Sequence, residues 1–355
     1  MKLNYGVIGT GMMGCEHIRN LKKIPDVRIV AIADPNEESR KWARKACEDK
    51  FKIRLYEDYK ELLVQKDIDV IVIASPNFTH IEVMRELFKT DKHVLLEKPM
   101  CTNLPDGLEV LRKSKKHEGL VWIGLEYRFM SPIQSLINHI EKIGDIRMLS
   151  IREHRFPFLK KVGNWNRFNE NTGGTLVEKC CHFFDLMNLI VPSKPIKVYA
   201  SGGQDVNHLD EKYDGKTPDI IDNSFVIIDY QDGQRAMLDL CMFAEAGKYE
   251  QEIVLTGDKG KLETYIPGNE LLLTNRKNYS LETILVKDDP RVKEVGFHHG
   301  ASYIEHLELI DCIKNKKKPL VDCQKGLDSI ILGLAAQESI PVSYTHLTLP
   351  TNREV

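Results

Sequence analysis

The sequence predicts an α/β protein with two unlike domains, a doubly wound parallel sheet followed by an α+β domain with a mostly antiparallel open sheet. Apolar runs alternate with helical patterns as far as about residue 125, and strand-like runs joined by hairpin signals follow. A chain of 355 residues also has the length of about two domains. We therefore expect domains at 1–125 and 126–341.

Composition and charge argue against several classes of partner. Apolar residues make up 42% of the chain, charged residues 29%, and the net charge is −2, so no positive excess attracts nucleic acid or an anionic membrane. The longest apolar runs are too short to span a bilayer. The N-terminus lacks a secretion signal and the eight cysteines lack CxxC spacing. We expect a cytoplasmic protein with reduced thiols and with neither a nucleic-acid nor a membrane partner.

The last fourteen residues depart from the pattern of the rest of the chain. A helical pattern ends near residue 340, and the stretch VSYTHLTLPT that follows looks like a translated sequencing adapter. We therefore expect 342–355 to be a non-native tail and give His346 no role.

A glycine motif in the first strand–helix unit predicts dinucleotide binding. A strand at 3–8 leads into a GxGxxG motif and a helix, whose N-terminal N–H groups suit a pyrophosphate. The second strand ends at Asp34, where an acid accepts ribose hydroxyls and repels the 2′-phosphate of NADP. A glycine-rich turn without a ligand is the alternative, and Arg40 leaves use of both cofactors open. We expect NAD, with NADP less favoured, bound by Gly9, Thr10, Gly11, Met12, Met13, Gly14 and Asp34.

Polar residues follow the later strands of the predicted parallel sheet, and ligands bind beyond the carboxyl ends of such strands. Lys98 stands between an apolar strand and Pro99. It either points into the crevice or is a solvated loop lysine, and the strand pattern leaves both readings open. We expect further cofactor contacts from Ser75, Pro76, Asn77, His80, Glu97, Lys98 and Glu126.

The second half reads as strands with few helices between them. Hairpin signals at 230–234 and 256–261 predict antiparallel pairing, and helical patterns occupy 131–142, 176–190 and 301–315. Such a sheet needs one covered face and could bury the other against a second subunit. The polar stretch 203–222 is expected to be a long loop.

The stretch VEKCCHFFDL raises the question of a metal site, a redox pair or proton transfer. Adjacent helical cysteines point apart and no CxxC or spaced histidine supports zinc, so we expect no metal and interpret Cys180 and Cys181 as core residues. Glu178 and His182, one helical turn apart, suit proton transfer. The alternative stays open that Glu178 is only the acid of a capping box begun by Thr175 and that His182 is a satisfied helix histidine.

Taken together, these motifs resemble the Gfo/Idh/MocA oxidoreductases over about residues 3–340. The resemblance rests on the GxGxxG start, on EKP at 97–99, and on Gly-Gly followed by acid-x-x-x-His in the second half. It implies an N-terminal Rossmann domain that binds NAD(P), oxidation of a sugar or cyclitol alcohol, and a homodimer or homotetramer. It also implies catalytic roles for Lys98 and His182, with Glu178 where many members have aspartate. The substrate-binding residues that it implies are Lys98, Tyr127, Arg128, Trp165, Arg167, Glu178 and His182.

Three functions follow as hypotheses. The first is an NAD-dependent dehydrogenase acting on a CH–OH group of a sugar, cyclitol or glycoside, with Lys98 and His182 in proton transfer and alkoxide stabilisation. The second is a glycosidase of the same family that recycles its NAD. The third is a dinucleotide-binding sugar sensor without catalysis, against which an intact Lys98 and His182 count.

Overall fold

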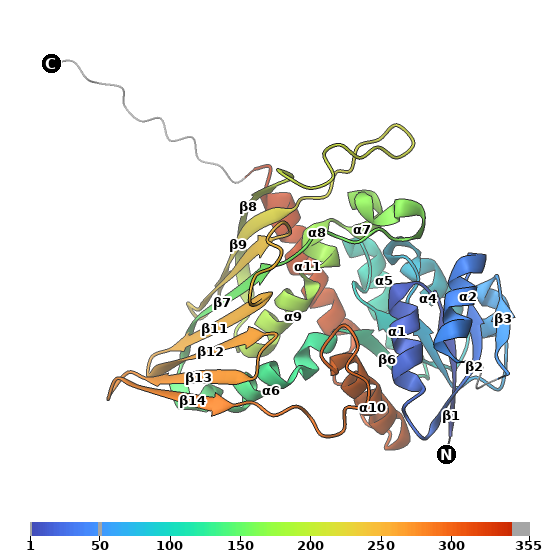
Figure 1. Ribbon diagram of the computed structural model, residues 1–355, viewed down its shortest axis with the longest axis horizontal. Coiled ribbons are helices and arrows are strands. Elements are labelled where there is room, and N and C mark those ends of the chain that lie inside the picture. The colour runs from blue at the N-terminus through green and yellow to red at the C-terminus, as the bar shows by residue number, and fades with distance from the viewer. Residues whose placement is uncertain (1, 49–51, 343–355) are drawn as a thin grey trace.

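The computed structural model describes residues 2–48 and 52–342, which form a parallel sheet and a mostly antiparallel sheet with helices between them (Figure 1). Apart from Val342, the predicted tail lies outside the described residues, and so does His346. No helix within the described ranges is both long enough and apolar enough to cross a membrane.

The first domain is a six-stranded parallel sheet in the order β3-β2-β1-β4-β5-β6. This order reverses between β1 and β4, and the crevice beyond these strand ends is where doubly wound sheets bind ligands. The strands are β1 (Leu3–Ile8), β2 (Val27–Ala33), β3 (Arg54–Tyr56), β4 (Val70–Ile73), β5 (His93–Glu97) and β6 (Val121–Gly124). The helices are α1 (Met12–Leu21), α2 (Glu37–Ala46), α3 (Tyr59–Leu63), α4 (His80–Leu87) and α5 (Leu104–Ser114).

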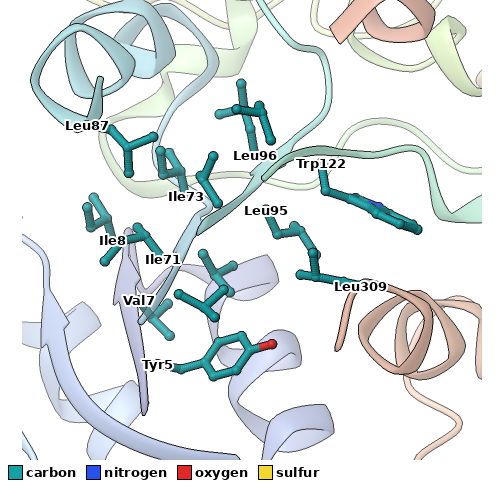
Figure 2. Close-up of a cluster of buried hydrophobic side chains, with 14 of the residues drawn as sticks. Tyr5, Val7, Ile8, Ile71, Ile73, Leu87, Leu95, Leu96, Trp122 and Leu309 are labelled. Atoms are coloured by element: carbon teal, nitrogen blue, oxygen red, sulfur yellow. The ribbon is translucent and has the colours of Figure 1, made fainter. Parts of the chain in front are cut away.

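Apolar side chains of the central strands form the core of this domain, as Figure 2 shows. Val7, Ile71 and Leu95 are completely buried, as expected for strands covered on both faces. Leu309, from the distant α10 (Ala301–Lys314), belongs to the same cluster. The late helix α10 therefore completes the first core.

The second sheet has eight strands in the order β14-β13-β12-β11-β7-β10-β9-β8. Only β7 and β10 pair in parallel; the other pairs are antiparallel. The predicted fold class is thus confirmed, and both predicted hairpins are present, joining β9 to β10 and β11 to β12. The strands are β7 (Ile146–His154), β8 (Pro195–Gly203), β9 (Asn223–Tyr230), β10 (Arg235–Cys241), β11 (Gln251–Gly257), β12 (Gly260–Ile266), β13 (Glu270–Asn275) and β14 (Ser280–Leu285).

Helices cover one face of the second sheet and leave the other open (Figure 1). The covering helices include α6 (Ser131–Asn138) and α11 (Cys323–Ser339). Helix α11 also joins the two cores, because Leu327 belongs to the first cluster and Leu332 to the second. The expected domain ranges, 1–125 and 126–341, remain a prediction. They assign the closing helices α10 and α11 to the second domain alone, although Leu309 and Leu327 of these helices belong to the first core.

The predicted capped helix at 176–190 is two short helices instead. Helix α8 (Thr175–Glu178) ends before α9 (Cys181–Ile190) begins. The alternative of a capping box begun by Thr175 is ruled out, because Gly174 occupies the N-cap position and the Thr175 hydroxyl donates to the carbonyl of Ile221 at 2.5 Å. The core prediction is confirmed, because Cys180 and Cys181 are completely buried, one in each core.

Candidate active site

The turn between β1 and α1, residues 9–14, forms a cradle with open space above it. Gly9 has φ +82°, and a Cβ there would lie 2.4 Å from the Ser75 nitrogen. A Cβ on Gly14 would lie 2.0 Å from the Gly9 carbonyl oxygen, whereas one on Gly11 would meet no atom within 4 Å. Helix α1 begins with no side-chain cap and no acid in its first turn. The cradle therefore has the room and the free N–H groups that a pyrophosphate needs.

Asp34 lies at the end of β2 against the cradle. Its carboxylate accepts hydrogen bonds from the Thr10 backbone nitrogen at 2.7 Å and from the Asn36 nitrogen at 2.8 Å. Arg40 donates to the Asp34 carbonyl at 2.6 Å and pairs with Glu57 at 2.7 Å. An acid is thus held at the end of β2 beside the cradle, and the guanidinium of Arg40 is already engaged by protein groups.

Among the polar residues after β4, His80 contacts the turn that follows β5. The His80 ring lies between two carbonyl oxygens, with Nδ1 2.9 Å from Pro99 and Nε2 3.0 Å from Ser75. Burial lowers the pKa of His80, although both carbonyls oppose this effect. Asn77 is also buried, and its Nδ2 has no hydrogen-bond partner among the described residues. His80 therefore ties the end of β4 to the turn that carries Lys98.

Lys98 follows β5 and reaches the second domain. Its Nζ donates to the backbone carbonyl of Glu178 at 3.3 Å. Burial opposes its charge, but the neighbouring Cys181 and the carboxylates of Glu97 and Glu126 outweigh this effect and raise the pKa of Lys98. The alternative of a solvated loop lysine does not fit this contact, because the side chain is half-buried and bonded to the second domain.

His182 lies in the first turn of α9 and is 2% exposed. Its ring stacks on Tyr127 with centroids 4.1 Å apart, and its Nε2 lies 3.7 Å from Oε1 of Glu126. Nδ1 is buried and has no hydrogen-bond partner within residues 2–48 and 52–342. Burial, followed by the charge of Lys98, holds the pKa of His182 well below its usual 6.5. The imidazole is therefore neutral near pH 7 and can accept a proton.

The Glu178 side chain pairs with Lys161. Its Oε1 accepts from Nζ of Lys161 at 2.9 Å, and its Oε2 is buried with no hydrogen-bond partner in the part of the chain that the structure describes. The acid near His182 is instead Glu126, which begins a 3₁₀ turn at Glu126–Phe129 directly after β6. Lys161 also lies 4.4 Å from the centroid of the half-buried Trp165 ring. Lys161 and Trp165 thus lie beside Glu178.

The other predicted substrate residues differ in their surroundings. The Tyr127 hydroxyl accepts from Nζ of Lys179 at 2.9 Å, and Lys179 pairs with the buried Glu153 at 2.8 Å. Arg128 makes a two-pronged ion pair with Asp185 of α9, which fixes the 3₁₀ turn against that helix. Arg167 is anchored to Glu211 at 2.8 Å and keeps one buried nitrogen, Nη1, without a partner. Tyr127 is therefore the member of this set that contacts His182.

Sequence reasoning missed several residues around His182. Lys161, Lys179 and His298 lie in or beside the site and were not predicted. Only Lys179 carried a signal, as a charged residue inside an apolar stretch. We call Glu126, Tyr127, Lys179 and His182 the second-domain wall. Within the described residues no group of three or more histidine, cysteine or acidic side chains could hold a metal.

Comparison with known proteins identifies the family of the chain. Residues 3–125 match the oxidoreductase family's NAD-binding Rossmann fold, and residues 137–343 match the C-terminal alpha/beta domain of the same family. The chain belongs to the Gfo/Idh/MocA oxidoreductases. The resemblance expected from the motifs is confirmed.

Two relatives and one solved structure illustrate how this Gfo/Idh/MocA chain relates to others. It is 28% identical over 345 residues to the myo-inositol 2-dehydrogenase of Thermotoga maritima, covering 95% of this chain and 96% of the relative. It is 24% identical over 305 residues to the 2,7-anhydro-N-acetylneuraminate hydratase of Mediterraneibacter gnavus, covering 84% and 76%. A levoglucosan dehydrogenase solved with NADH and levoglucosan has a TM-score of 0.83 at 18% identity, covering 96% and 98%, and so shares the fold.

Proposed function

We propose that the protein is an NAD-dependent dehydrogenase that oxidises a secondary alcohol of a sugar, cyclitol or glycoside. The observation that carries the proposal is the approach of a lysine ammonium and a neutral imidazole from two domains. Lys98 binds the carbonyl of Glu178, four residues before His182, and its charge lowers the pKa of that histidine. The 28% identity to a myo-inositol 2-dehydrogenase over nearly the whole chain supports this substrate class.

Each of the two side chains has a separate task in this reaction. His182 accepts the hydroxyl proton, because its low pKa leaves the ring neutral. The ammonium of Lys98 stabilises the negative charge that develops on the alcohol oxygen. NAD, when bound in the cradle, supplies the hydride acceptor. Because His182 and Glu126 are almost fully buried, little water competes for the proton at this point.

NAD is the proposed cofactor in preference to NADP. The Asp34 carboxylate is held at the end of β2 by the Thr10 and Asn36 nitrogens, where it would repel a 2′-phosphate. Arg40 could otherwise neutralise that phosphate, but its guanidinium is engaged by Glu57 and by the Asp34 carbonyl.

A substrate screen tests the proposal. Sugars, inositols and glycosides are offered with NAD or NADP, and NADH formation is followed by absorbance. In a Lys98→Met variant we expect kcat to fall about 10²- to 10³-fold, because one preorganised charge is lost, while calorimetric NAD binding persists. The exposed Lys116→Met serves as control and keeps full activity. Normal turnover in Lys98→Met would refute the assignment.

A second candidate is a redox-neutral enzyme of the same family, such as an NAD-recycling glycosidase. The 24% identity to a 2,7-anhydro-N-acetylneuraminate hydratase favours keeping this candidate. In such a reaction transient oxidation of a hydroxyl allows a neighbouring group to leave, and the hydride then returns. The same screen discriminates, because product without net NADH indicates the redox-neutral reaction. Sugar binding with neither product nor NADH indicates a sensor.

We also propose a homodimer or homotetramer joined through the open face of the second sheet. Large apolar side chains stand exposed on neighbouring strands of that face, which is unusual for a monomer. Light scattering should give a multiple of 40.7 kDa, and a monomer mass would refute this assembly. The side chains are Met148, Tyr199, Phe225, Ile227 and Met237.

A further inference from the structure

Glu126 is a buried acid without a hydrogen bond. The residue is 1% exposed, and neither carboxylate oxygen has a hydrogen-bond partner among the described residues. Burying a carboxylate in this way is costly, so a neighbouring group must compensate. Oε1 of Glu126 lies between two imidazoles, 3.7 Å from Nε2 of His182 and 3.4 Å from Nε2 of His298.

His298 continues the line of ionisable groups away from His182. Its Nδ1 lies 3.3 Å from Oε1 of Glu16, which belongs to α1 directly behind the cradle. Glu16 also accepts from the Phe297 backbone nitrogen at 3.1 Å, which holds this segment on the first domain. The His298 side chain is 17% exposed, against 2% and 1% for those of His182 and Glu126. Among these three groups, His298 is therefore the one that water reaches.

The carboxylates around His298 favour its protonated form. Burial opposes its protonation, but Glu126, Glu16 and Glu97 outweigh that effect and raise the pKa of His298. Burial is also the main cause that raises the pKa of Glu126, with Glu97 adding to it and His298 and Lys98 opposing. The elements packed around His298 thus present three acids from α1, β5 and the 3₁₀ turn, together with the Tyr127 ring at 5.9 Å and the Ser302 hydroxyl at 3.4 Å.

We propose that Glu126 and His298 carry the proton released at His182 to solvent, with Glu126 accepting it from His182 and His298 passing it on. This inference rests on the proposed dehydrogenase function, in which alcohol and NAD give ketone, NADH and one proton. The proton leaves Nε2 of His182 for the Glu126 carboxylate and then passes to His298. Each transfer breaks one N–H or O–H bond and forms another, and release to water restores the imidazole without a further reactant.

The distances from Glu126 to the two imidazoles agree with a relay to which no substrate or cofactor is bound. At 3.7 Å and 3.4 Å, the two contacts of Glu126 exceed an ordinary hydrogen bond by about 0.8 Å and about 0.5 Å. Catalytic hydrogen bonds are often long without ligands and shorten once substrate and cofactor are bound. The shared atom, Oε1 of Glu126, lets a small side-chain movement bring the acid to either ring.

A purely structural role is the competing explanation. Glu16 and His298 could serve only to fasten the segment before α10 onto α1. Such a fastening would affect the unfolding temperature but not the pH dependence of turnover. The relay instead predicts that loss of His298 changes kcat and its pH profile, with little change in KM, because His298 is not among the expected substrate or cofactor contacts.

The first test needs no substrate. Histidine ring resonances of the full chain are followed by NMR between about pH 5 and pH 8, with His298→Gln used for assignment. We expect His298 to titrate above the usual 6.5 and to shift downward in Glu126→Gln. The exposed neighbour His299→Asn is the control and should not move that titration downward, because the charges of the two imidazoles repel each other. A His298 titration that is the same with and without the Glu126 carboxylate would overturn the relay.

The second test uses the substrate found in the screen. We expect His298→Gln and Glu126→Gln to lower kcat about 10- to 100-fold at neutral pH, and added imidazole to restore part of the His298→Gln loss. His299→Asn retains the wild-type rate. Unchanged kcat and solvent isotope effect in His298→Gln would overturn the relay but leave the dehydrogenase intact. Failure of every alcohol to reduce NAD would overturn the proposed function itself, whatever the NMR titration shows.

Discussion

The cradle at residues 9–14 presents mainly backbone groups, whereas the second-domain wall presents buried side chains. The cradle is formed by backbone, with glycines where any side chain would collide or would fill the space left for a ligand. The wall is formed by ionisable side chains that are almost fully buried and contact one another across long separations in the chain. The cradle should therefore be sensitive to added volume, and the wall should be sensitive to removed charge.

Removing a charge beside the wall should give the largest effect on stability. In Arg128→Met the Asp185 carboxylate stays buried without its partner, so we expect a loss of about 3–5 kcal/mol in the free energy of unfolding at pH 7. Urea titration measures it. Arg85→Met, which breaks an exposed ion pair with Glu109, is the control and should leave the midpoint almost unchanged.

The pH dependence of this effect follows from Asp185. Burial raises the pKa of Asp185 while Arg128 opposes the rise, so removing Arg128 raises that pKa further. A raised pKa in the folded state means that folding destabilises the ionised form of the carboxyl group relative to its protonated form. The deficit of Arg128→Met should therefore be full at pH 7 and shrink as the pH falls through the raised pKa of Asp185. A deficit that is the same at all pH values would mean that packing, not charge, holds the turn.

Adding volume to the cradle should separate folding from binding. Gly14→Ala places a methyl group 2.0 Å from the Gly9 carbonyl, which cannot rotate away, so we expect a loss of about 1–3 kcal/mol in stability. Gly11→Ala places the same group in open space, so the protein should unfold as the wild type does. NAD should nevertheless bind more weakly to Gly11→Ala in calorimetry. Unaltered NAD affinity in that variant would show that no pyrophosphate lies above Gly11.

The same contrast explains what the sequence could predict. The cradle was predicted residue by residue because its parts are adjacent in the chain and a short spacing encodes them. The second sheet was predicted as mostly antiparallel because turn residues mark its hairpins. The site residues Lys98 and His182 came from the resemblance, since strand and helix patterns alone left both of them undecided.

The rest of the site depends on contacts that no local pattern encodes. Glu126 and His298 are far apart in the chain, and Arg128 meets Asp185 across 57 positions. The break between α8 and α9 was missed because helical periodicity continues through Lys179 and Cys180. Tertiary contacts, such as the bond from Thr175 to the Ile221 carbonyl, override the local capping signal there.

The smallest effect should come from Asp34, whose carboxylate accepts a hydrogen bond from the Thr10 nitrogen of the cradle. Asp34→Asn keeps one oxygen to accept from either the Thr10 or the Asn36 nitrogen, loses the second acceptor, and removes the charge that repels a 2′-phosphate. We expect the ratio of NAD to NADP affinity to fall about tenfold, which corresponds to about 1.4 kcal/mol. Glu57→Gln is the companion variant, because it weakens the hold on Arg40 without touching the cradle. A further gain of NADP binding in the double variant would mean that Arg40 can turn to the phosphate, whereas an unchanged ratio in Asp34→Asn would remove the charge of Asp34 from cofactor choice.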